Sequence, residues 1–142
     1  MRRAVIAIPL AVVVLAGCGG GGGRLSHSDF VKRADELCRT AVAKARAVAK
    51  PQTLSEFPRY LQDLRKIQVR FLADARKLRP PVRDEGDWRR ALAFDERVLH
   101  QYDLLTGAYR RHDRAAVRRI TKRLEALPGR NPYERRLGMK GC

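Results

Sequence analysis

The chain has 142 residues, of which 44% are hydrophobic and only 6% are aromatic. This length and composition exclude several large domains and favour one domain with a modest aliphatic core, of the kind formed by helices packed on helices. Lys and Arg number 31 against 15 Asp and Glu, a net charge of +16, so the surface should attract polyanions or anionic membranes.

The N-terminal segment has the pattern of a cleavable signal peptide. Two arginines precede an uncharged, mostly aliphatic run at residues 4–16, which is too short for a membrane span of roughly 20 residues. The run ends in Leu15, Ala16, Gly17 and Cys18, which resembles the bacterial lipobox. We therefore expect residues 1–17 to be removed and the Cys18 thiol to carry a diacylglyceryl group. The alternative is an ordinary secretory leader.

This interpretation predicts where in the cell the protein is located. Two acyl chains on one residue provide stable anchoring, so we expect an exported lipoprotein on the outer face of the cell membrane. Loss of Arg2 and Arg3 leaves 29 basic against 15 acidic residues, a net charge of +14. Residues 18–28 begin with Cys18 and five glycines, a composition typical of a flexible tether. A phosphate-binding loop is excluded, because no strand precedes the glycines and no Lys-Ser/Thr pair follows them.

Residues 29–142 should form the folded domain. Ser26 and Asp29 have the spacing of a helix cap, and apolar residues repeat every three or four positions from Phe30 until a break at Pro51. A second cap between Thr53 and Glu56 precedes a helix that reaches Leu78, before two prolines.

Two further helices follow. Asp84 or Asp87 can cap a third helix that runs to about Arg111, and Asp113 can cap a fourth that ends at Pro128-Gly129. The three-four rhythm of the fourth helix is that of bundle packing. We predict an all-α fold, an antiparallel up-and-down four-helix bundle, with residues 130–142 forming a helical turn and a terminal arm.

Cys38 and Cys142 remain as an even pair once Cys18 carries lipid. Outside the cytosol such a pair can oxidise, so we predict a disulfide between them. The alternative is a buried free thiol at Cys38 and a loose Cys142.

The chain resembles a group of small, uncharacterised helical lipoproteins from GC-rich actinobacteria. The resemblance lies in Phe30-Val31-x-x-Ala34-Asp35-x-x-Cys38, Leu78-Arg79-Pro80-Pro81, His112-Asp113-x-Ala115-Ala116-Val117 and Arg135-Arg136-Leu137-Gly138-Met139-x-x-Cys142. It departs in Gly141, where an apolar residue is expected, and in ending at Cys142. The resemblance implies the anchor, the fold and the disulfide. It implies no reaction.

Catalytic and metal-binding patterns are weak. The histidines form no His-x-x-x-His pair, and Glu96 and His100 lack the partners of a di-iron site. Adjacent acids such as Asp35-Glu36 and Asp95-Glu96 point in different directions on a helix. We predict no enzymatic activity, no metal site and no cofactor, haem included.

A cluster of cations, called here the basic patch, falls on and before the fourth helix: Arg110, Arg111, Arg114, Arg118, Arg119, Lys122 and Arg123. It could bind anionic lipids or wall polymers. Alternatively it is a solvated face, since Arg outnumbers Lys by 24 to 7 and a GC-rich genome also produces that ratio. Nucleic acid is a poor third partner, because the chain is expected to be exported and lacks a recognition pattern.

Two hypotheses follow. The first is a non-enzymatic, membrane-tethered helical module whose basic surface binds an anionic lipid, a wall polymer or a protein partner. The second is a small-molecule or substrate-binding lipoprotein with a pocket in the bundle near Trp88 and Tyr102. An unrecognised enzyme ranks third.

Overall fold

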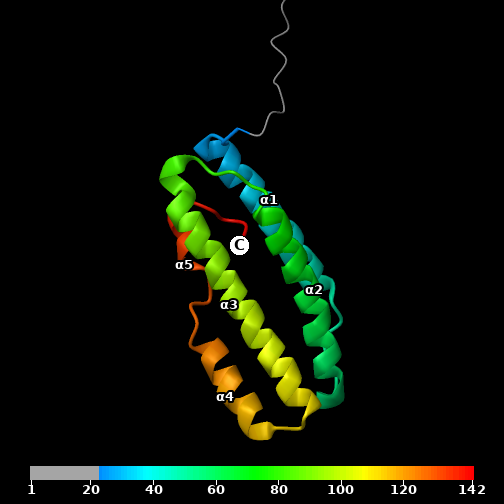
Figure 1. Cartoon of the computed structure of the whole chain (residues 1–142). Helices are drawn as coiled ribbons and strands as arrows, with labels where there is room; N and C mark the ends of the chain where they lie inside the picture. The colour runs from blue at the N-terminus through cyan, green and yellow to red at the C-terminus, as the bar shows by residue number, and fades with distance from the viewer. Residues whose placement is uncertain (1–22) are drawn as a thin grey trace, which may run out of the picture.

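The computed structural model describes residues 23–142, and this part of the chain is helical without any strand (Figure 1). The signal peptide, Cys18 and most of the tether lie outside the described residues. The helices are α1 (His27–Ala47), α2 (Phe57–Ala75), α3 (Glu85–Arg110), α4 (Arg114–Glu125) and α5 (Pro132–Arg136), with 3₁₀ turns at Leu54–Glu56 and Val82–Asp84. The all-α prediction is confirmed.

Local capping explains several helix ends. The Ser26 hydroxyl accepts the backbone N–H of Asp29 at 3.2 Å, and Asp113 accepts that of Ala116 at 2.9 Å, so both predicted caps are confirmed. Asp84 also stands at the N-cap of α3, but its carboxylate makes no cap bond there and instead contacts His27 Nδ1 at 2.6 Å. The second helix begins later and ends earlier than expected, because a 3₁₀ turn precedes Phe57 and the α-helix stops at Ala75.

The helices pack as successive neighbours. The extensive pairings among the described residues are α1 with α2, α2 with α3, α3 with α4 and α3 with α5. In Figure 1, α4 lies beside the lower half of α3 and α5 beside its upper half. Since α4 has 12 residues and α3 has 26, one short helix cannot cover the whole of α3. This arrangement is compatible with the predicted four-helix bundle, with α4 not packed along α1.

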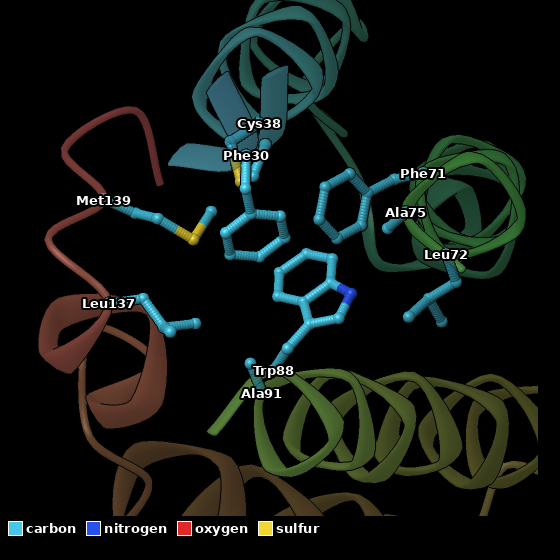
Figure 2. Close-up of a cluster of buried hydrophobic side chains, with 10 residues drawn as sticks. Phe30, Cys38, Phe71, Leu72, Ala75, Trp88, Ala91, Leu137 and Met139 are labelled. Carbon is cyan, nitrogen blue, oxygen red and sulfur yellow. The ribbon is translucent and has the colours of Figure 1, made fainter. Parts of the chain in front are cut away.

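The core consists of two clusters. One lies where α1, α2, α3 and the C-terminal arm meet, and Figure 2 shows Phe30, Phe71 and Trp88 facing one another, with Met139 approaching from the arm. The rings of Phe30 and Trp88 pack edge to face with centroids 5.1 Å apart. The second cluster joins α2, α3 and α4 through Leu61, Leu105, Ala108, Ala116 and Ile120.

The C-terminal arm is fastened to α1. The N–H groups of Lys140 and Gly141 donate to one carboxylate oxygen of Asp35 at 2.8 and 2.9 Å. Cys142 forms a disulfide with Cys38. The Cα atoms of the two cysteines lie 5.1 Å apart, a normal separation for a disulfide.

The position of Gly141 requires a glycine for a steric reason. A Cβ at this position would lie 2.5 Å from the backbone oxygen of Asp35 and 3.2 Å from Cγ of Arg39. The arm therefore passes so close to α1 that no side chain fits here.

Candidate functional site

The basic patch is fully exposed. All seven of its side chains are exposed, and they lie on the last turn of α3, on the turn that follows it and on α4. None of them takes part in an ion pair or a side-chain hydrogen bond within residues 23–142. Some cations elsewhere are paired: Arg65 lies 2.5 Å from Asp103, and Arg76 lies 2.6 Å from Glu96. The patch therefore keeps its charge available for an external anion.

The pattern of α4 explains this exposure. Ala116 and Ile120 are buried against α3 and α2, so the helix turns its remaining faces outward. Arg114, Arg118 and Lys122 follow one another at four-residue steps along one such face. Glu125 is the only acid in α4, which leaves the outward face strongly positive.

An apolar hollow adjoins the patch. It has a volume of about 690 Å³ and is lined by Leu54, Pro58, Tyr109 and Val117 together with three patch residues, Arg110, Arg114 and Arg118. Leu54 is 74% exposed, and Tyr109 stacks on Phe57 with ring centroids 5.2 Å apart. The surface here combines cations with exposed apolar carbon, which suits an amphipathic anionic partner.

The patch begins at the end of the molecule opposite to the point where the chain enters the helices. At the entry, Arg24 pairs with Glu85 at 2.9 Å, and the N–H of Leu25 donates to the carbonyl oxygen of Arg79. These contacts hold the start of α1 beside the start of α3, and Figure 1 shows both at the upper end. The 26 residues of α3 extend about 39 Å, and Arg110 lies at their far end.

A cleft lies between α1, α3 and the segment that joins α4 to α5. Its volume is about 460 Å³. Its lining includes both cysteines of the disulfide, Pro128 and Gly129. The other apolar lining residues are Ala41, Val42, Phe71, Phe94, Val98, Leu124 and Leu127, and the polar ones are Gln68, Asp95, Tyr102, Arg130, Asn131 and Glu134. It opens where α4 does not pack along α1.

Two acids in the cleft have raised pKa values. Burial raises the pKa of Asp95 to about 6, against the opposing effect of a hydrogen bond from Asn131 at 3.3 Å. Burial also raises the pKa of Glu134 to about 8, helped by the nearby charge of Asp95 and opposed by that of Arg130. Glu134 is only 3% exposed. Perturbed acids in a concave site are typical of functional positions.

Asn131 explains how Glu134 comes to be buried. Its side-chain oxygen accepts the N–H of Tyr133, and its side-chain nitrogen donates to the backbone oxygen of Ala91 at 3.0 Å. The first of these two hydrogen bonds caps the start of α5, and the second fixes α5 to α3. Glu134 therefore faces inward, although it precedes two exposed arginines.

No pattern in the sequence identifies Glu134 or Asp95 as a site residue. The run Glu134-Arg135-Arg136 looks like a solvated turn, and no local pattern distinguishes its first residue. The two aromatic residues expected near one pocket are separate: Trp88 is 4% exposed within the core, whereas Tyr102, about 21 Å further along α3, lines the cleft. Burial, followed by the influence of Tyr60, raises the pKa of Tyr102.

The acids judged non-catalytic from their spacing do separate as expected. Asp35 is buried and bonded to the arm, while Glu36 is exposed. Asp95 faces the cleft, while Glu96 pairs with Arg76 on the surface.

One group within the described residues has metal-binding geometry. The ligand atoms of Cys38, Cys142 and Glu134 lie within 4.8 Å of one another. The two sulfurs are joined in the disulfide and offer no thiolate, so this group has no thiolate ligands in the oxidised protein.

None of the helices in the described part is long and apolar enough to cross a membrane. We found no family model that matches the chain, and no curated protein or solved structure to which it is significantly similar.

Proposed function

We propose that the protein is an exported lipoprotein, related to the small actinobacterial lipoproteins that it resembles. In this proposal residues 1–17 are cleaved, Cys18 carries the lipid, and residues 18–28 tether an up-and-down four-helix bundle to the outer face of the cell membrane. The support for the anchor is the sequence Leu15-Ala16-Gly17-Cys18 behind a short apolar run.

The molecule then acts as a non-enzymatic binding module for an anionic wall polymer. The observation that carries this is the basic patch itself, seven exposed cations without an ionic partner among residues 23–142, beside an apolar hollow. Near an anionic surface each such charge contributes roughly 1 kcal/mol. We therefore propose that the patch binds a ligand and is more than a solvated helix face.

The position of the patch favours a polymer over the membrane that holds the anchor. Arg110 lies about 39 Å along α3 from the end where the chain enters, whereas electrostatic attraction decays over about 8 Å at physiological salt. A bundle standing on its tether would present the patch to the wall and not to the headgroups.

The test is binding of residues 24–142, which hold every described helix, to poly(glycerol phosphate) and to vesicles containing phosphatidylglycerol across a salt series. Charge reversal at Arg114, Arg118 and Lys122 removes at least about 3 kcal/mol and should weaken polymer binding at least about 100-fold. The matched control reverses three exposed cations of α1: Lys32, Arg33 and Lys44.

Equal binding by the patch variant and the wild type would refute the proposal. Binding to anionic vesicles but not to the polymer would make the patch a second membrane contact instead.

The cleft favours a second candidate function, a small-molecule or substrate-binding lipoprotein with its pocket in the bundle. Its lining combines apolar side chains with two buried acids, the usual composition of a ligand site. We propose no nucleic-acid partner, cofactor or reaction for the protein.

A further inference from the structure

Glu134 is a buried acid without a partner. Its side chain is only 3% exposed, lines the cleft, and forms no hydrogen bond or ion pair with the described residues. The charge of the nearby Arg130 lowers the pKa of Glu134, but its guanidinium donates to the backbone oxygen of Met139 and makes no ion pair with Glu134. Buried acids are normally hydrogen-bonded or paired, so the carboxyl of Glu134 is free to accept a partner from outside the chain.

A second carboxyl group, that of Asp95, lines the cleft from α3. Its one described side-chain hydrogen bond comes from the neutral amide of Asn131. The lining also includes apolar side chains, among them Val42, Val98 and Leu124. The lining of the cleft thus combines two carboxyl groups with hydrocarbon.

We propose that the cleft binds an organic cation, a protonated amine carried on an apolar body, with the ammonium group held by Glu134 and Asp95. This inference names the ligand class for the second candidate function and rests on it. It is independent of the basic patch. α4 contributes only Leu124 to the cleft wall, while its cations are exposed on the outer faces of the helix.

The chemistry of the walls selects this class. An anion would meet two carboxyls beside the single cation of Arg130, and a thiolate-bound metal would require reduction of the disulfide. An ammonium group donates three hydrogen bonds as a compact charge, which suits carboxyl oxygens. The apolar wall can bury the carbon chain behind it.

Binding should release a proton. The charged groups facing Glu134 are Asp95 from α3, Asp35 from α1 and Arg130 before α5, and burial is the largest influence on its pKa of about 8. At pH 7 the free protein therefore keeps Glu134 protonated. An ammonium group beside it favours the carboxylate, so the proton passes from the Glu134 oxygen to water as the cation enters.

The experiment uses the full chain in detergent micelles, labelled with ¹³C at its glutamate carboxyls. The Glu134 resonance is assigned by its absence from Glu134→Gln. n-Butylammonium chloride is the probe, sodium chloride at equal ionic strength controls for screening, and n-butanol controls for the apolar chain. Methyl resonances of Val98 and Leu124 report occupancy of the cleft.

We expect n-butylammonium to lower the midpoint of the Glu134 titration to about pH 7, a tenfold change in proton affinity, and sodium to leave it in place. Glu134→Gln should weaken n-butylammonium binding at least about tenfold and leave n-butanol binding unchanged. Glu125→Gln, at an exposed acid of α4, should change neither.

Equal binding of n-butylammonium by Glu134→Gln and the wild type would overturn the ligand class while leaving the cleft a binding site. No change of the methyl resonances with either probe would overturn the second candidate function together with the inference.

Discussion

Removal of the Cys38–Cys142 disulfide should destabilise the folded domain strongly. The bond closes a loop with a sequence separation of 104. In the chain-entropy model a loop of this size restricts the unfolded chain by about 4.7 kcal/mol, a large part of the 5–15 kcal/mol that typically stabilises a domain. The perturbation is the double variant Cys38→Ser and Cys142→Ser, which leaves no free thiol in residues 24–142.

The assay is urea unfolding of residues 24–142, followed by far-ultraviolet circular dichroism. With a denaturant slope of about 2 kcal/mol/M, a loss of 4.7 kcal/mol lowers the midpoint by roughly 2 M. Reduction of the wild-type domain should give a similar decrease, and reduction of the double variant should give none. A double variant within about 1 kcal/mol of the oxidised wild type would refute the loop-closure reasoning.

Three further changes test single features. Gly141→Ala should cost about 1–3 kcal/mol because its Cβ would lie 2.5 Å from the backbone oxygen of Asp35; Gly129→Ala, with nothing within 4 Å, is the control, and thermal unfolding measures both. Asp113→Ala should cost about 1 kcal/mol in urea unfolding, since the Ala116 N–H loses its acceptor. Because burial raises the pKa of Glu134 from 4.5 to about 8, its contribution to stability is fully present below pH 4.5 and is lost as the pH rises through 8. The urea midpoint should fall across this window, and Glu134→Gln should flatten that fall.

The helices were largely predictable because their signals are local. Ser26 and Asp113 cap helices through bonds that span three residues, and prolines 51, 80 and 81 lie in the breaks between helices. The early end of α2 was not predictable from periodicity, since Leu78 continues the apolar repeat but lies in the turn that follows the helix.

The cleft could not be predicted, because it depends on lengths and contacts far apart in the chain. It exists because α4 is less than half as long as α3, so that α5 and the arm cover part of what a full fourth helix would cover. Glu134 is buried only because Asn131 bonds to Ala91, 40 residues earlier. A basic, turn-like sequence around Glu134 carries no sign of this.

The position of the disulfide also determines how the protein would respond to proteolysis. Cys38 and Cys142 close a covalent ring that contains the C-terminal part of α1 and all of α2 to α5. A single cut within the ring, for example in the exposed segment before α2 where Leu54 is 74% accessible, leaves two pieces joined through sulfur. Such a nicked molecule would keep every helix attached to the N-terminal segment, and the pieces would separate only on a reducing gel.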